Sequence, residues 1–203
     1  MSKGEITRSA ILDSALSLAS EAGLAGATIG ALADRTKMSK SGLFAHFQSK
    51  ENLEIAILEE AIRRFVALVI SPALAEKRGE PRVRALFDRW LAWPKHEFLP
   101  GGCVFAVAAV ELDDRPGRAR DVLVGAQKDW MGTLAQAARI AVDEGHFRKD
   151  LDVHQFAFEE FTLVYGTQIV HRLGLDPKPG RRLRTAFDRL VLEARNCRLV
   201  MKD

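Results

Sequence analysis

TIGALADRTKMSKSGLFAHFQSKENL is the stretch from Thr28 to Leu53, and its three helix starts are the main signal for the predicted fold. Thr28, Ser39 and Ser49 each come directly before a segment with the spacing of a helix start. Such hydroxyl residues cap helix N-termini, because the side-chain oxygen accepts a hydrogen bond from a free backbone N–H. The stretch therefore predicts two short helices joined by a tight turn at residues 36–38, followed by the start of a longer helix.

The middle helix is expected to have one buried side and one outward side. Leu43 and Phe47 form its apolar side, and a helix of about two turns cannot stand alone in water, so its neighbours must hold it. The outward residues are Lys40, Ser41, Phe44, Ala45 and His46, with Gly42 allowing close approach. This pattern is typical of a helix-turn-helix, whose second helix enters the major groove of DNA.

Positive charge is concentrated in the same stretch. Residues 28–50 contain the basic residues Arg35, Lys37, Lys40 and Lys50 and one acidic residue, Asp34, which leaves a net charge of +3. The whole chain also carries a formal net charge of +3, so the other residues sum to zero. A solvated helical hairpin with several lysines would have a similar composition, but caps, turn length and charge together favour DNA binding.

The N-terminal residues resemble a known family. The matching residues are Arg8, Ile11, Leu12, Ala15, Gly23, Thr28, Leu32, Ala33, the run SKSGLFAHF at 39–47 and the run SKENL at 49–53. Over about the first 55 residues, they are similar as a set to the N-terminal domain of TetR-type (tetracycline-repressor-like) transcriptional regulators. The resemblance implies a DNA-binding domain, a dimer and a small-molecule pocket in the C-terminal domain.

Two residues depart from the pattern of that family. Lys37 stands in the turn where the family usually has Gly. A Lys held at positive φ would cost about 1 kcal/mol, so a different turn shape is expected. Phe44 stands where the family usually has Tyr, so a hydroxyl contact to phosphate is missing.

The predicted contacts to DNA come from this stretch alone. They are Thr28, Lys37, Ser39, Lys40, Ser41, Gly42, Phe44, Ala45, His46 and Lys50. Of these, Thr28, Lys37 and Lys50 are expected to meet phosphates. Lys40, Ser41, Gly42, Phe44 and His46 are expected at the groove or its walls, and exchange of Ser41 or Ala45 should alter base preference. The predicted partner is double-stranded DNA with a palindromic operator, because a dimer places two recognition helices about one turn of DNA apart.

Length and composition indicate a globular all-α protein. The chain has 203 residues, of which 47% are hydrophobic and 28% charged, and β-branched runs are short. We expect a helix-turn-helix domain at residues 1–50 and a helical ligand-binding and dimerisation domain at residues 51–203. The longest apolar run, 103–110, is too short to span a bilayer, and residues 1–8 have no apolar signal core, so a cytoplasmic protein is expected.

Apolar periodicity predicts the remaining helices. Their expected ranges are 5–22, 50–70 (ended by Pro72), 81–98, 103–112, 116–144, 153–173 and a last helix carrying Leu183 to Ala194. The last two helices have more apolar surface than one subunit should need, which favours a homodimer joined by a four-helix interface. Packing within one subunit is the alternative.

Aromatic residues of the second domain are the candidates for a small-molecule effector site. The predicted pocket residues are Trp90, Trp93, Phe98, Cys103, Phe105, Trp130, Phe161 and Tyr165. Ordinary core packing is the alternative for each, but Trp needs a partner for its indole N–H, and effector pockets are mostly apolar with few polar groups. Cys103, near a predicted helix N-terminus, could have a lowered thiol pKa and sense redox or thiol-reactive signals.

Catalytic, metal and cofactor sites are not expected. No pair of histidines has the HExxH spacing, and no glycine run matches a phosphate loop. The acidic residues at 111–114 are interpreted as a charged loop, and Glu159 and Glu160 as a solvated or interface edge. Cys103 and Cys197 are the only cysteines, so no disulfide framework is expected.

The sequence therefore predicts a non-enzymatic transcriptional repressor that binds a palindromic operator as a dimer and is released by a small molecule. Two alternatives stay open. One is a constitutive DNA-binding protein without a ligand. The other is a small-molecule-binding helical protein that no longer binds DNA, which an altered turn at Lys37 would favour.

Overall fold

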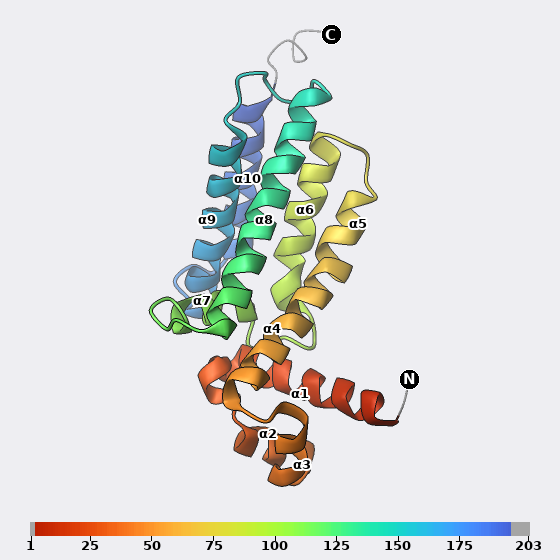
Figure 1. Cartoon of the computed structure of the whole chain (residues 1–203). Coiled ribbons are helices and arrows are strands. Elements are labelled where there is room, and N and C mark those ends of the chain that lie inside the picture. Colours follow the sequence, from red (N-terminus) through yellow and green to blue (C-terminus); the bar gives the residue numbers. More distant parts are fainter. Residues whose placement is uncertain (1–2, 196–203) are drawn as a thin grey trace. The chain divides into compact units, whose positions relative to one another are not determined.

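The computed structural model describes residues 3–195, and side chains from residue 8 onward (Figure 1). The described residues are helical with no strand, apart from one isolated bridge between Phe147 and Arg195, which confirms the all-α prediction. The helices are α1 (Lys3–Gly26), α2 (Ile29–Thr36), α3 (Lys40–Phe47), α4 (Lys50–Phe65), the π-helix η1 (Val66–Ile70), α5 (Ser71–Leu74), α6 (Glu80–Ala92), the 3-10 helix η2 (Trp93–Lys95), α7 (Val104–Glu111), α8 (Arg118–Asp143), α9 (Val153–Arg172) and α10 (Pro179–Ala194). Cys197 lies outside the described residues.

The chain forms two compact units. The described part of the first unit contains residues 3–66 and 92–126, and that of the second contains residues 67–91 and 127–195. Helix α7 and the first part of α8 thus belong to the same compact unit as the N-terminal helices. The functional division near residue 50 stays a prediction.

Helix α1 bends at Gly23, where a helix end was predicted. Gly23 has φ 77° and ψ 172°, and a short helical turn follows it to Gly26. The N–H group of Leu24, freed by the bend, donates to the Glu111 carboxylate at 2.6 Å. A Cβ on Gly23 would lie 2.1 Å from Glu111 Oε1, so the residue must be Gly for this approach as well as for its φ.

Close packing of the 96–102 loop on α1 also requires a glycine. The Gly101 N–H donates to Ser20 Oγ at 3.0 Å, and a Cβ on Gly101 would lie 1.9 Å from the Ser20 carbonyl oxygen. Glu111 and Gly101 together hold α7 and its preceding loop on α1.

Two prolines act differently from the sequence prediction. Pro72 was expected to end the long helix, but the chain passes through η1 into α5, where Pro72 occupies the first turn. A helix needs no N–H there, so proline is tolerated. The predicted helix at 81–98 is also wrong at its end, because α6 stops at Ala92 and Pro94 starts the 3-10 turn η2.

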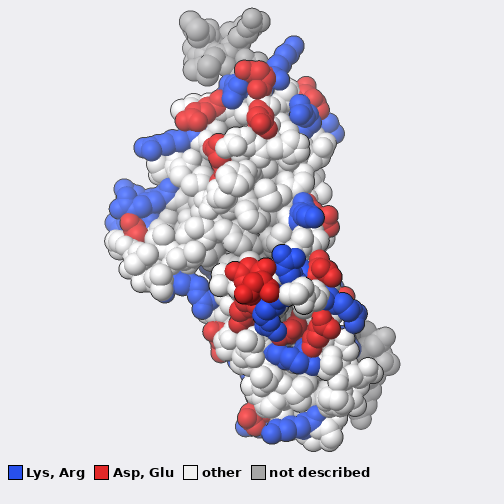
Figure 2. Space-filling view, turned by 60° about the vertical axis from the view of Figure 1, so that its left-hand side comes forward, with Lys and Arg blue, Asp and Glu red and all other residues white. Residues whose placement is uncertain are grey.

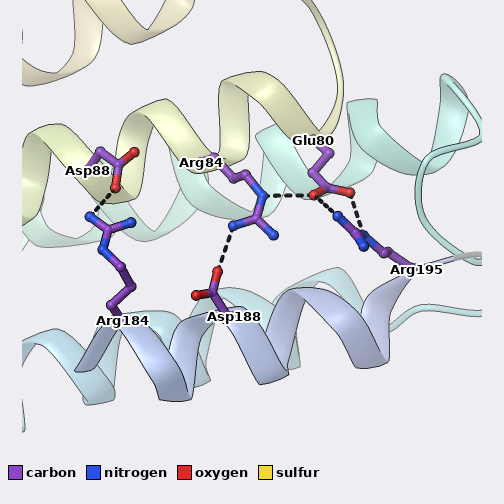
Figure 3. Close-up of polar contacts among 6 residues, drawn as sticks. All are labelled: Glu80, Arg84, Asp88, Arg184, Asp188 and Arg195. Atoms are coloured by element: carbon purple, nitrogen blue, oxygen red, sulfur yellow. Dashed lines mark hydrogen bonds and ion pairs between the residues drawn. The ribbon is translucent and has the colours of Figure 1, made fainter. Parts of the chain in front are cut away.

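Helices α6 and α10 of the second unit are joined by stacked rings and ion pairs. The rings of Phe87 and Phe187 lie 3.7 Å apart and parallel, with Arg184 over Phe87 and Arg84 over Phe187. Figure 3 shows the polar contacts around this stack. Arg84 bonds Glu80 and Asp188, Arg184 bonds Asp88, and Arg195 bonds both carboxylate oxygens of Glu80.

Candidate DNA-binding surface and aromatic clusters

Three hydroxyl groups start α2, α3 and α4, as predicted. Thr28 Oγ1 accepts from Ala31 N at 3.1 Å, Ser39 Oγ from Gly42 N at 3.1 Å, and Ser49 Oγ from Asn52 N at 3.0 Å. A Cβ on Gly42 would lie 3.1 Å from Ser39 Oγ, so the small residue fits closely against the cap. Thr28 caps the start of α2 and Ser39 caps the start of α3, and these two helices form the helix-turn-helix.

The turn between α2 and α3 keeps a left-handed residue at Lys37. Lys37 has φ 57° and ψ 25°, which is the conformation that glycine adopts most readily. The expectation of a different turn shape is therefore wrong. The turn geometry is retained because the caps and the buried faces of both helices fix the backbone, and the strain at Lys37 is tolerated.

Helix α3 buries one side and exposes the other. Leu43 and Phe47 are buried, which confirms the predicted apolar face. The exposed side carries Lys40, Ser41, Phe44 and Ala45, while Gly42 and His46 are half-buried. Phe44 is 55% exposed, an unusual state for a large aromatic side chain. Thr28, Lys37 and Ser39 are also exposed, so they could reach a bound duplex.

The basic residues of the 28–50 stretch differ in whether they form an ion pair. Arg35 pairs with Glu21 at 3.1 Å and donates to Ser17 Oγ, and its hydrogen bond lowers the pKa of the Glu21 carboxyl. Lys37 and Lys40 have no ion pair among the described residues. These two ammonium groups are the exposed, unpaired positive charges of the stretch.

Lys50 has an internal role that the sequence did not indicate. Its ammonium donates to the carbonyl oxygens of Leu24 and Ala27, the latter at 2.9 Å, and lies 3.5 Å from the buried carboxylate of Glu54. Burial lowers the pKa of Lys50. These contacts hold the ammonium group against the carbonyls of residues 24 and 27, and a phosphate contact of Lys50 stays a prediction.

The seven aromatic residues among the eight predicted pocket residues fall into two clusters. In the first unit, Trp93 contacts Phe98 and Phe105 at ring distances of 5.5 and 6.0 Å. In the second unit, Trp90 contacts Trp130 at 5.1 Å, and both Phe161 and Tyr165 lie within 6.0 Å of it. The Tyr165 hydroxyl donates to Gln127 Oε1 at 2.7 Å. That these clusters bind a small molecule stays a prediction.

Cys103 differs from the reactive thiol considered above. Its side chain is buried in the first unit. Burial raises the pKa of the thiol, and backbone hydrogen bonds from Ala106 and Phe105 only partly oppose this. A raised pKa disfavours the thiolate, so the expectation of a lowered pKa is wrong.

Glu160 is a buried acid rather than a solvated edge. It is 1% exposed, and Oε1 has no hydrogen-bond partner among the described residues. Burial raises its pKa to about 8. Its spacing of four residues from Phe156 and from Val164, both buried, was the signal that could have placed it on the inner face of α9.

Uncharged and apolar side chains are exposed on α9 and near it. Phe158, Ile169, Leu173, Leu175 and Leu192 are each more than half exposed. Figure 2 brings forward the side of Figure 1 on which α9 lies and shows a broad area without charged side chains there. Phe158 and Ile169 lie on α9, Leu173 and Leu175 follow its end, and Leu192 lies on α10, which makes these residues candidates for an interaction surface.

No cluster of three or more His, Cys, Asp or Glu side chains among the described residues could hold a metal ion. Glu111, expected in a charged loop, instead caps the bend of α1. None of the helices that the structure describes is long and apolar enough to cross a bilayer.

The fold and the capped α2–α3 pair define a helix-turn-helix DNA-binding protein. The family model described as "Tetracyclin repressor-like, C-terminal domain" matches residues 79–187, and that described as "Bacterial regulatory proteins, tetR family" matches residues 11–57. The chain belongs to the TetR family of DNA-binding transcriptional regulators.

Solved structures share the fold over most of the chain. A TetR transcriptional regulator from Chloroflexus aurantiacus is 24% identical, with a TM-score of 0.83 over 95% of this chain and 96% of that one. A TetR-family regulator from Cytophaga hutchinsonii is 21% identical, with a TM-score of 0.83 over 100% and 99% of the two chains. AibR, solved in complex with isovaleryl coenzyme A and operator DNA, is 24% identical, with a TM-score of 0.66 over 77% and 83%. A comparison with curated proteins found no match.

Proposed function

We propose that this chain is a repressor that binds a near-palindromic operator as a homodimer and leaves it when a small molecule binds. The observation that carries the proposal is the outward side of α3, where Lys40, Ser41, Phe44 and Ala45 are exposed while the opposite side is buried. Lys37 and Lys40 supply unpaired positive charge for the phosphates beside the groove.

The proposed dimer rests on the apolar surface of the second unit. Exposed Phe158 and Ile169 lie on α9, exposed Leu173 follows its end, and exposed Leu192 lies on α10. A second copy of the chain would bury these side chains in a four-helix interface. Two copies would then present two α3 helices to successive turns of DNA, which is why a near-palindrome is expected.

The proposed effector would bind among the aromatic side chains of the C-terminal region. The cluster around Trp90 in the second unit and the cluster around Trp93 in the first unit are two separate candidate sites; the former has Tyr165 and Gln127 as polar groups. AibR, which shares the fold, was solved with both an acyl coenzyme A and operator DNA. Release from DNA requires that the effector binds the DNA-free form more tightly, and the coupling is reciprocal.

Selection of bound duplexes from a random pool tests the proposal. The purified chain should enrich one sequence with two-fold symmetry. Enrichment of a sequence without symmetry would contradict the dimer, and no enrichment would contradict operator binding.

A thermal-shift screen with lipophilic and cationic compounds, followed by operator-release assays, tests the effector. A compound that raises the melting temperature should also lower operator affinity. If no stabilising compound changes operator affinity, constitutive DNA binding is the better description.

A further inference from the structure

Phe44 is the main unexplained feature of the recognition surface. Its ring is 55% exposed on α3, beside exposed Ala45 and one turn after Lys40 and Ser41. The aromatic contacts found within the described residues around α3 involve His46 and the buried Phe47, not Phe44. An apolar ring exposed on this side of the helix gains free energy if an apolar group covers it in the complex.

The chemistry of the exposed side limits which base features it can read. Helix α3, KSGLFAHF, contains no Asn, Gln, Asp or Glu, so it lacks the side chains that pair with adenine or accept from cytosine, and Lys40 is its one side chain of the type that contacts guanine. Lys40 and Ser41 can make single hydrogen bonds, but Phe44 and Ala45 present only carbon and hydrogen. The part of the outward surface formed by Phe44 and Ala45 is therefore apolar.

The major groove has one apolar feature that differs between base pairs. This feature is the C5-methyl group of thymine, which apolar side chains contact. The ring of Phe44 has no hydroxyl, so it cannot bond a phosphate oxygen. The methyl group of Ala45 lies on the same side of α3, and it extends the apolar surface.

We infer that Phe44 and Ala45 read thymine through its C5-methyl group, so that each operator half-site carries thymine where this surface enters the groove. The inference rests on the proposed operator binding and adds to it the chemical class of the base that is read. A cytosine methylated at C5 presents the same methyl group at the same place, so it should partly replace thymine there.

Deoxyuridine scanning of the selected operator tests the inference. Deoxyuridine keeps the pairing of thymine and removes only the methyl group. Replacement at one or two symmetric positions per half-site should weaken binding about three- to tenfold, and the other thymines should be insensitive. Replacement of a sensitive T·A pair by C·G should weaken binding further, and methylation of that cytosine at C5 should recover part of the loss.

Protein variants assign the effect to the side chain. Phe44→Ala should bind the thymine and deoxyuridine operators equally at the sensitive position, whereas Phe44→Leu should keep the difference. Lys37→Ala is the matched control, because losing a phosphate contact should weaken binding to both operators equally and preserve their ratio. Each variant should have the melting temperature of the native chain, since an exposed residue is replaced.

The outcomes separate this inference from the proposed function. If no operator is selected, operator binding fails and the inference fails with it. If an operator is selected but no deoxyuridine changes affinity, the inference alone is overturned, and Phe44 then contacts sugar or phosphate. Deoxyuridine sensitivity that persists unchanged in both Phe44→Ala and Ala45→Gly would also overturn it.

Discussion

Lys50 joins the start of α4 to the backbone of residues 24–27. Its ammonium holds the carbonyl oxygens of Leu24 and Ala27 and lies beside Glu54, which is 4% exposed. Lys50→Ala should lower the free energy of unfolding by about 1–3 kcal/mol, because the carbonyls and the buried carboxylate lose their cation. Chemical denaturation measures this loss.

The salt dependence of operator affinity separates this role from a phosphate contact. In Lys50→Ala it should match that of the native chain. A salt slope reduced by about one per subunit would show that Lys50 binds phosphate after all. Lys77→Ala, which removes an exposed lysine of the second unit, is the control and should change neither stability nor slope.

Burial of Glu160 makes the free energy of unfolding fall as pH rises, which is opposite to the effect of an acid whose pKa is lowered by an ion pair. Below about pH 4.5, the carboxyl is protonated in both states. Between 4.5 and its folded pKa of about 8, only the unfolded state releases the proton, so stability falls as pH rises. The fall is at most about 1.4 kcal/mol per pH unit and ends above pH 8.

Glu160→Gln should remove this dependence. The difference in unfolding free energy between the variant and the native chain, measured by urea denaturation, should therefore increase from pH 5 to pH 8 in favour of the variant. Glu159→Gln, at the half-buried neighbouring position, is the control and should give a constant difference. Parallel curves for Glu160→Gln and the native chain would contradict the buried, neutral state of this acid.

At the scale of elements, the α6–α10 contact combines buried rings with exposed ions. The carboxyl of Glu80 illustrates the balance, because burial raises its pKa but hydrogen bonds from Arg195 and Arg84 leave it below its usual value. The Arg184–Asp88 pair, by contrast, is about half exposed on both sides. Exposed pairs contribute little, so the stacked rings should supply most of the stability of this contact.

Replacing Phe187 or Arg184 tests whether the stacked rings contribute more stability than the ion pairs. Phe187→Ala should lower the free energy of unfolding by about 3–5 kcal/mol, because the side chain is fully buried against Phe87. Arg184→Ala should cost only about 1 kcal/mol, from its ion pair and its place over the Phe87 ring. Equal losses in denaturation experiments would mean that the ion pairs matter as much as the rings.

At the scale of the whole molecule, the apolar surface of α9 should control both assembly and DNA affinity. Ile169 is 59% exposed, so Ile169→Glu should leave the fold of one subunit intact while placing charge in the proposed interface. Sedimentation should show a monomer with an unchanged circular dichroism spectrum. Operator affinity should fall about 100-fold or more, because the two half-sites are no longer bound together.

Val110→Glu is the matched control for this change. Val110 is an exposed apolar residue of α7, 72% exposed. The variant should stay dimeric and bind the operator normally. A dimer that survives in Ile169→Glu would place the interface elsewhere.

Features that depend on neighbours along the chain could be predicted from the sequence. The caps at Thr28, Ser39 and Ser49, and the buried side of α3, follow from hydrogen bonds and apolar spacing within one or two turns. These local signals were sufficient to predict the all-α class and the helix-turn-helix. The ends of helices were predicted less well. Pro72 and Pro94 each lie in the first turn of a new helical segment, and apolar spacing alone does not specify that position.

Contacts between distant segments determine which charged groups face water and which support the fold. Lys50 reaches carbonyls more than twenty residues earlier, and Glu111 reaches the N–H of Leu24 from α7. Burial of Glu160 depends on what packs against α9, and the left-handed conformation of Lys37 depends on the helices that flank it. Each of these results from contacts between segments that the sequence does not pair, and the free energy of packing outweighs the local preference of the residue.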